Sequence, residues 1–343
     1  MPLSKIQGIQ GQVTPNLGRR NLIINGAMQV AQRGTVTGMS SGATFGGPDR
    51  FASGITSHGA YTASQSTTVP SGKGFAKSYK LDCTTADTSI AANAEVTIQH
   101  KFEGNTLQSI RKGTSEAKSI TATFYCRSNL TGTFTLEFFD NDNSRQCSKN
   151  FTISSANTWE FKSITFPADT TGTLDDDNNQ SAVLVWWLAA GSNFTSGTQN
   201  TSAFASNTNA NRVSSSIVNM SSSTDNEFLL TGVQLEVSDT ATEFEHEPFA
   251  VTLEKCQRYF QNNDVGALVV PTVRVSDGIR RGTLFYPTRM RSNSPSVTLT
   301  NTTLDGAGLS VDEARDTGVA ITMSSGSDGN VPKVHIYTVE DEL

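Results

Sequence analysis

The sequence predicts an all-β protein: an antiparallel jelly-roll β-sandwich followed by a short connector helix and a second, smaller β domain. Short apolar runs rich in Val, Ile, Thr and Phe recur between turns rich in Gly, Ser and Asn, which is typical of a β fold. Charged residues make up only 17% of the 343 residues, and long amphipathic helical windows are nearly absent. No helical stretch between the strand candidates is long enough for a parallel crossover, so antiparallel pairing is favoured.

The first, larger domain is expected at residues 21–250, because a chain of this length exceeds the roughly 250 residues at which one core usually stops growing. The segment NLIINGAMQVAQRG places Asn25-Gly26 between two short runs and predicts a strand, a tight turn and a strand. Residues 191–216 are poor in large apolar residues and predict an extended surface loop. The remaining strand candidates are 61–67, 77–83, 95–101, 119–128, 132–140, 159–167, 181–189 and 226–237.

The second domain follows a connector helix. Leu253, Cys256 and Tyr259 recur at helical spacing after a proline, which predicts a helix over 251–262. Beyond it, Asp277-Gly278 stands between two alternating runs and predicts a hairpin. Three later runs, SVTLT, GVAITMS and KVHIYTV, complete a small β domain at residues 263–343.

Net charge excludes some partners and suggests another. The chain carries −6 with a pI near 5.3 and has no basic patch interleaved with aromatic residues, so nucleic acid is not an expected partner. Residues 1–20 are the exception, because they hold Lys5, Arg19 and Arg20 and no acidic residue. This segment is expected to be an attachment arm that docks on an acidic neighbour, and a loose terminus is the alternative.

The apolar and sulfur-containing residues point to a protein folded in a cytoplasm. The longest apolar run, AVLVWWLAA, is far shorter than the roughly 20 residues of a membrane helix, so no membrane association is expected. No apolar leader is visible at the N-terminus. The four cysteines lie tens of residues apart without metal-binding or disulfide-framework spacing, so they are predicted to be small buried apolar residues.

A cluster of ionisable residues at 243–247 is the first candidate for a catalytic or metal-binding site. In an extended strand Glu243, Glu245 and Glu247 share one face, whereas Phe244 and His246 point to the other. His246 is therefore not expected to act together with the three glutamates. We interpret the stretch as the closing strand of the sandwich, with a solvated acidic face rather than a catalytic or metal site.

Other local patterns do not predict an enzyme, a cofactor or a metal site. GMSSG matches the nucleophile-elbow pattern at Ser40, but Gly, Ser and Pro continue after it where a helix is required, so it predicts a loop. Asp175, Asp176 and Asp177 could supply carboxylates to a calcium ion, although adjacent acids in loops are more often solvated. No phosphate-binding or dinucleotide-binding glycine loop is present.

Trp186 and Trp187 are the candidates for glycan contact. Neighbouring strand residues point to opposite faces, so one indole is expected in the core and the other on an outer face. An exposed indole could stack on a sugar ring. The alternative is that it packs under a loop or against a neighbouring subunit.

Several segments, in this order, resemble a family of bacteriophage tail-fibre and virion structural proteins whose corresponding region is similar to a carbohydrate-binding-module-like jelly roll, as found in marine and cyanobacterial phages. Ala27 and Phe51 depart from residues that relatives often have at these positions. The segments are NLIINGAMQVAQRGT, PDRF, SITATFYCRS, WEFKSITFPADTTGT, FLLTGVQLEVSDTATEFEHEPF and EKCQRYF, with weaker echoes in FYPTRMRSNSPSVT and YTVEDEL.

The resemblance implies a tail fibre that recognises the host-cell surface, expected to bind an envelope glycan and to work without catalysis. It further implies a homotrimer in the virion tail, assembled in the host cytoplasm and joined by residues 1–20 to another tail or head structural protein. Two alternatives stay open. One is a head-fibre or decoration protein of the capsid or tail without receptor binding, and the other is a polysaccharide depolymerase.

Overall fold

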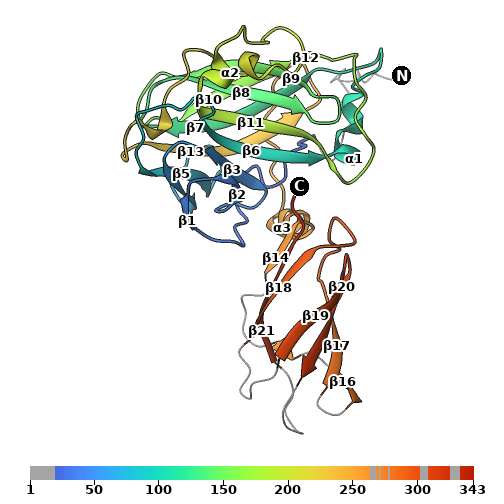
Figure 1. Cartoon of the computed structure of the whole chain (residues 1–343). Helices are drawn as coiled ribbons and strands as arrows, with labels where there is room; N and C mark the ends of the chain where they lie inside the picture. The colour runs from blue at the N-terminus through green and yellow to red at the C-terminus, as the bar shows by residue number, and fades with distance from the viewer. Residues whose placement is uncertain (1–19, 263–267, 270–271, 277–278, 302–307, 325–332) are drawn as a thin grey trace, which may run out of the picture.

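The computed structural model describes residues 20–262, 268–269, 272–276, 279–301, 308–324 and 333–343. A large two-sheet sandwich forms one unit, and a small β unit extends from one end of it through a short helix (Figure 1). Lys5 and Arg19, which belong to the predicted attachment arm, and the predicted Asp277-Gly278 turn lie outside the described residues.

The sandwich consists of two antiparallel sheets. Sheet A runs in the order β1-β4-β5-β13-β7-β10 and sheet B in the order β12-β9-β8-β11-β6-β3-β2. Sheet A comprises β1 (Val36–Met39), β4 (Ala60–Ser66), β5 (Ser78–Thr85), β7 (Ile120–Ser128), β10 (Glu160–Phe166) and β13 (Glu227–Glu236). Sheet B comprises β2 (Gly42–Phe45), β3 (Phe51–Thr56), β6 (Glu95–Glu103), β8 (Gly132–Asp140), β9 (Arg145–Ile153), β11 (Gln180–Ala190) and β12 (Ala205–Ser206).

The order of these strands confirms the predicted jelly roll. From β5 onward the chain crosses between the sheets, so that β5-β13-β7-β10 faces β6-β11-β8-β9. All eight strand candidates of the larger domain are present. The core lies between the sheets, where alternate residues of each strand meet, as with Phe124 of β7 and Trp186 of β11 at 5.7 Å between ring centroids.

Helices are few and short, as predicted. The sandwich carries α1 (Gly104–Leu107), α2 (Ser192–Thr195) and the 3-10 turns η1 (Gln108–Ile110), η2 (Asn209–Asn211) and η3 (Met220–Ser222), and α3 (Phe249–Gln257) leads to the small unit. Within the described part of the chain, no helix has the length and apolarity needed to span a membrane.

The strand-turn-strand prediction for residues 21–34 is wrong, because this segment contains no strand. Its main chain is bonded to the irregular part of β13: Leu22 donates to the Leu235 carbonyl and Val233 donates to the Gly26 carbonyl, at 2.8 and 2.9 Å. Asn25 adopts a positive φ of 62°. Its side chain accepts from the main-chain N–H of Val30 and donates to that residue's carbonyl. Side-chain bonds therefore replace a sheet ladder here.

The acidic stretch 243–247 also lies outside the sheet, since β13 ends at Glu236. The predicted closing strand is correct only as far as that residue. Phe244 and His246 nevertheless share a side, because both rings contact Phe75, at 5.0 and 5.3 Å between centroids. The acids serve as structural partners: Glu245 accepts from the main-chain N–H of Asn21 at 2.8 Å, and Glu247 pairs with Lys255.

The small unit is built from two four-stranded sheets. One contains β14 (Phe260–Asn262), β21 (Lys333–Glu340), β15 (Leu268–Val269) and β18 (Ser296–Asn301). The other has the order β16 (Thr272–Ser276), β17 (Ile279–Phe285), β20 (Gly318–Ser324) and β19 (Gly308–Arg315). Leu284, Met290, Ile321 and Val339 belong to a core of its own. The predicted connector of 251–262 is thus the helix α3 followed by the first strand of this unit.

Candidate functional site

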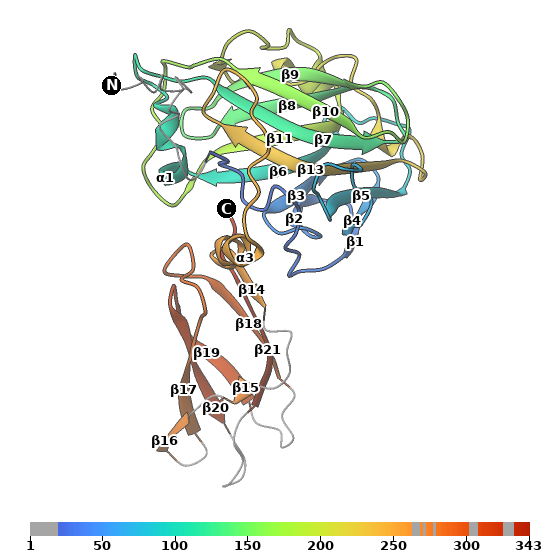
Figure 2. The ribbon, with the colours of Figure 1, turned by 180° about the vertical axis from the view of Figure 1, so that it is seen from behind.

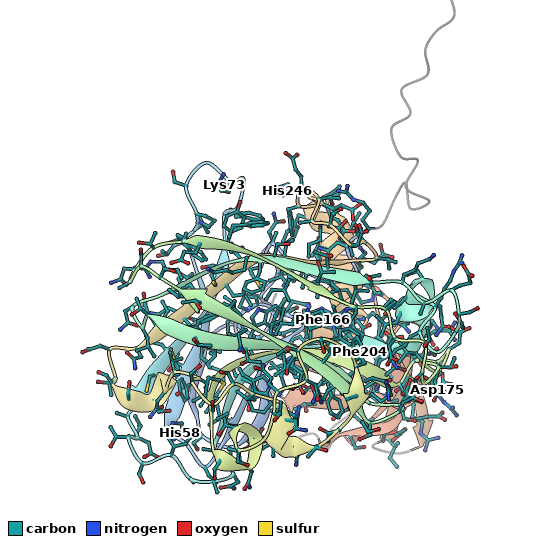
Figure 3. All side chains as sticks on the ribbon, turned by 90° about the horizontal axis from the view of Figure 1, so that it is seen from above. His58, Lys73, Phe166, Asp175, Phe204 and His246 are labelled. Atoms are coloured by element: carbon teal, nitrogen blue, oxygen red, sulfur yellow. The ribbon has the colours of Figure 1, made fainter. Side chains whose placement is uncertain are left out.

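The outer face of sheet B is covered by the segment 191–217, of which the sequence predicts residues 191–216 to be a surface loop. Phe194 and Val213 of this segment are buried against Val185 and Trp187 of β11. Figure 3 shows the sandwich from above, with His58 on one side and His246 on the other. The surface-loop prediction is correct in that many residues of the segment are exposed and its regular elements are short, but a few apolar residues dock the segment on sheet B.

A buried ion pair fastens this cover. Arg212 donates two hydrogen bonds to Glu137, Nε to Oε1 at 2.8 Å and Nη2 to Oε2 at 2.9 Å. Trp187 donates its indole N–H to Oε2 of the same carboxylate at 2.8 Å. The guanidinium also lies over the Trp187 ring, 5.1 Å from its centroid. We call Glu137, Arg212 and Trp187 the sheet B clamp. Burial opposes the charge of Arg212, but Glu137 outweighs that effect and raises the pKa of Arg212.

The predicted glycan contacts are therefore corrected. Trp186 is 0% exposed in the core between the sheets, and Trp187 is 1% exposed beneath the cover. Neither indole can stack on a sugar ring in this arrangement. The alternation that placed them on opposite faces was right, and the cover explains why the outward indole is not accessible.

Arg212→Met should lower the free energy of unfolding by about 3–5 kcal/mol, because Glu137 would remain as a buried, unpaired carboxylate. Trp187 should also become accessible, which shifts its fluorescence emission to longer wavelength. Urea denaturation and emission spectra measure both effects. Arg315→Met is the matched control, since Arg315 and its partner Glu313 are both more than half exposed and the loss of this pair should change stability by less than about 1 kcal/mol. Equal effects of the two substitutions would contradict the clamp.

The outer face of sheet A carries an aromatic cluster. Phe75, Tyr125, Phe161, Phe244 and His246 form a connected series with ring centroids 4.9–5.7 Å apart. They come from the β4–β5 loop, β7, β10 and the segment after β13, and Figure 2 shows this side of the sandwich toward the viewer. We call these five residues the sheet A aromatic cluster. Lys73 and His246 lie on the same side of the sandwich (Figure 3).

A bulge in β13 makes room for this cluster. The register of β13 against β7 shifts between Thr231 and Gln234, and Gly232 within it has a φ of +62°. A Cβ at Gly232 would lie 2.6 Å from the Phe75 ring, so a side chain there would displace the ring. Phe75 is thereby held at the centre of the cluster.

Phe161 is the accessible end of the cluster. It lies directly opposite Tyr125 across the β7–β10 pair, and 50% of its surface is exposed although its sheet neighbours are packed. An apolar ring half in solvent on an edge strand contributes little to folding. It offers a flat apolar surface to a ligand instead.

A second candidate surface lies where the small unit meets the sandwich. Arg50 is fully buried, pairs with Glu342, donates from Nη2 to the Lys101 carbonyl at 2.8 Å and lies 3.4 Å above the Tyr259 ring centroid. Arg33 lies 3.1 Å from both Glu340 and Glu342 through its two terminal nitrogens. Cations of the sandwich therefore hold one carboxylate at the end of β21 and one just after it.

Segments that carry the family resemblance meet at this junction. Gln32 of NLIINGAMQVAQRGT donates to Asp49 of PDRF at 2.6 Å and to the Phe260 carbonyl of EKCQRYF at 2.8 Å. Arg33 lies 3.7 Å above the Phe260 ring centroid. These short motifs lie far apart in the sequence, and their contacts join the sandwich to the small unit.

A cavity of about 500 Å³ lies beside the junction. Leu22, Ile24 and Phe102 give it apolar walls on the sandwich side, and α3 with the following residue closes it opposite. Polar groups complete the lining: Asn21, His100, Lys101, Glu103, Asn105, Thr106, Ser109, Lys255, Arg258 and Tyr259. We call it the junction cavity. Its volume falls in the range of small-molecule sites, about 300–1,000 Å³.

Glu103 supplies the carboxylate in the cavity lining, and both of its carboxylate oxygens already accept hydrogen bonds. Arg258 donates to both oxygens at 2.9 and 2.7 Å, Asn105 donates at 3.3 Å, and the Tyr259 hydroxyl also donates. Burial alone would raise the pKa of Glu103, but these donors outweigh it and lower the pKa below its ordinary 4.5. His100 accepts from the Ile24 N–H through Nε2. Burial and the charge of Arg50 lower the pKa of His100 well below 6.5, so the ring is neutral.

The lowered pKa of Glu103 makes junction stability depend on pH. The contribution is fully present above the ordinary carboxyl pKa of 4.5 and is lost as pH falls through the lowered folded pKa. Glu103→Gln should therefore be less stable than the unsubstituted protein at pH 7, and the gap should narrow below pH 4.5. Urea denaturation of both proteins at several pH values measures this gap. A stability difference between the two proteins that stays constant with pH would contradict the lowered pKa of Glu103.

The other candidates from the sequence have ordinary structural settings. Arg20, the described residue of the proposed arm, donates to the Glu243 carbonyl at 3.2 Å. Asp177 accepts from its neighbour Asn179, and Asp175 donates its N–H to Asp142. Asp175 lies on a loop at the periphery of the sandwich (Figure 3). No group of three or more metal-ligating side chains converges among the residues with described positions. The four cysteines are buried free thiols, as predicted.

Comparison with known proteins gives distant structural likeness. No protein-family model matches the chain, and no curated protein matches it. The enzymatically active domain of tailspike protein 4 of bacteriophage CBA120 aligns with 64% of this chain and 21% of its own at 13% identity and a TM-score of 0.32.

Two carbohydrate-binding modules align over their whole length. The module TmCBM61, solved with β-1,4-galactotriose, covers 64% of this chain at 7% identity and a TM-score of 0.32. A xylan-binding domain from Paenibacillus barcinonensis covers 62% at 9% identity and a TM-score of 0.28. The chain is thus distantly similar to carbohydrate-binding-module β-sandwiches and to part of a phage tailspike. At these identities and TM-scores the likeness carries no argument about function.

Proposed function

We propose that this chain is a bacteriophage tail-fibre protein that binds a host-surface glycan through the sheet A aromatic cluster. The observation that carries the proposal is the half-exposed Phe161 ring beside Tyr125 at the β10 edge of sheet A, whereas the outward indole of sheet B, Trp187, is covered. The family resemblance of the sequence supports the virion setting.

A pyranose ring suits such a surface. One face of the ring presents C–H groups, and an aromatic side chain can cover it at low entropic cost, since the aromatic side chain has few rotatable bonds. Polar groups stand close by: His246 belongs to the cluster itself, and Lys73 lies on the same side (Figure 3). Together they provide apolar stacking and hydrogen bonding for the sugar hydroxyls.

The proposed role is binding without catalysis. Residues 1–20 would join the chain to another tail or head structural protein, and the chain would reside in the virion tail after assembly in the host cytoplasm. The cationic residues of that segment, Lys5, Arg19 and Arg20, support docking on an acidic neighbour.

Phe161→Ala should weaken binding to an immobilised array of bacterial envelope polysaccharides at least about tenfold, because loss of an aromatic side chain that dominates an interface costs about 2 kcal/mol or more, and about 1.4 kcal/mol is a factor of ten. Phe249→Ala is the matched control: Phe249 is 53% exposed on α3, and its removal should leave binding unchanged. Both variants should keep the far-ultraviolet circular dichroism spectrum of the unsubstituted protein.

If the protein retains no glycan, or if Phe161→Ala binds as well as the unsubstituted protein, the glycan proposal is overturned.

Antibody labelling of intact particles tests the virion setting separately. Signal on the tail supports a fibre, whereas signal on the capsid would favour the head-fibre or decoration alternative. Sugar release from the retained polysaccharide would favour the depolymerase alternative.

The fibre proposal includes a homotrimer, and an exposed aromatic residue of the small unit supports it. Phe285 is 77% exposed at the end of β17, while its neighbour Leu284 points into the core. Light scattering should give about three times the 36.7 kDa of one chain. Phe285→Asp should lower that mass and leave a folded monomer. A monomeric mass for the unsubstituted protein would contradict the trimer.

A further inference from the structure

The junction cavity offers a ligand more hydrogen-bond donors than acceptors. Its carboxylate, Glu103, accepts four hydrogen bonds from Arg258, Tyr259 and Asn105. A carboxylate has about four lone-pair sites, so Glu103 has little capacity left for a ligand. The Thr106 hydroxyl donates to the Glu103 carbonyl at 2.8 Å. A hydroxyl-rich neutral ligand would find few acceptors here.

Cationic side chains in the cavity lining can still donate hydrogen bonds to a ligand. Lys255 has three N–H donors, and its carboxylate partner is Glu247, which does not line the cavity. Lys101 is also half-buried in the lining, where it donates to the Leu343 carbonyl, and burial lowers its pKa. An anion placed in the cavity would add a second acceptor for these two ammonium groups, whereas a second cation would be repelled.

The apolar wall of the junction cavity and its cationic residues lie on opposite sides. Leu22, Ile24 and Phe102 lie on the sandwich side, and Lys255 and Arg258 lie opposite on and after α3. A ligand that matches both sides has one apolar face and a carboxylate at its edge. The volume of about 500 Å³ accommodates one or two sugar rings.

We propose that the junction cavity binds a carboxylate-bearing pyranose, such as a hexuronic acid unit, with its ring against the apolar wall and its carboxylate toward Lys255. The proposal rests on the proposed glycan-binding function for the origin of the sugar, and it names an acidic polysaccharide as the substrate class. The cavity is separate from the sheet A aromatic cluster, because no residue of the cluster lines it.

The experiment uses the full chain and ligand-observed NMR titration with sodium glucuronate, glucose and sodium acetate. Glucuronate should bind at least about tenfold more tightly than glucose, since a charge-assisted hydrogen bond contributes about 1.5–3 kcal/mol. Acetate should bind more weakly than glucuronate, because it lacks the ring that covers the apolar wall.

Two variants localise the site. Lys255→Gln should weaken glucuronate binding at least about fivefold and leave glucose unchanged. Its matched control is Lys80→Gln, because Lys80 also pairs with a glutamate, Glu227 at 2.9 Å, at a distant position in sheet A. Ser109→Trp should abolish binding by filling the cavity, since Ser109 is an exposed residue of its lining. Circular dichroism verifies that each variant is folded.

Equal affinity for glucuronate and glucose, or no effect of Lys255→Gln, would overturn this inference. Its failure and that of the proposed function are distinguishable. If polysaccharides on the array are retained in a Phe161-dependent manner but glucuronate does not bind, the cavity inference fails and the glycan proposal stands. If glucuronate binds and Lys255→Gln weakens it, while no polysaccharide is retained, the cavity inference stands and the glycan proposal fails.

Discussion

A single buried carboxylate holds a cover over one face of the sandwich. Glu137 points outward from β8, and a charge at that position must be paired if it is to be buried. Arg212 and Trp187 supply three hydrogen bonds, and in doing so they hold the segment 191–217 across sheet B. On sheet A the outward residues Leu229, Thr231 and Thr123 are also buried, and the accessible aromatic surface lies at its β10 edge, where Phe161 belongs to the sheet A aromatic cluster.

The junction places the small unit where it does not cover that surface. Arg33 and Arg50 of the sandwich hold the carboxylates of Glu340 and Glu342, and the small unit extends from one end of the sandwich (Figure 2). Buried pairs of this kind fix geometry more than they add stability, since each charge loses its hydration. Tyr259, whose ring lies beneath Arg50, also lines the junction cavity, so the joint and the proposed acidic-sugar site share this residue.

Much of the fold followed from the sequence, because strand period and turn chemistry are local. β8 and β11 were predicted to within a residue by alternating or continuous apolar runs. β9 was not predicted, because RQCSKNFTI alternates between small polar and apolar residues and lacks a strong run. The segment 21–34 was read as a hairpin, since the bonds from Asn25 that replace the ladder are invisible in a hydrophobicity pattern.

The candidate sites were largely inaccessible to sequence reasoning. Phe75, Phe161 and Phe244 are far apart in the chain, and only the bulge at Gly232 and the packing of two loops bring them together. Trp187 was the obvious outward aromatic residue, but a distant arginine and a polar-looking segment cover it. The sequence signal that could be used was the occurrence of short motifs such as PDRF and EKCQRYF together, and these motifs meet at the junction rather than at the proposed sugar-binding surface.

The most direct test of this account is a crystal structure of the chain with an oligosaccharide of a polysaccharide that it retains. The account predicts a sugar ring lying over Phe161 and Tyr125 on the outer face of sheet A, with the segment 191–217 still in place over sheet B. A sugar bound on sheet B, with Arg212 displaced from Glu137 and Trp187 exposed, would contradict it.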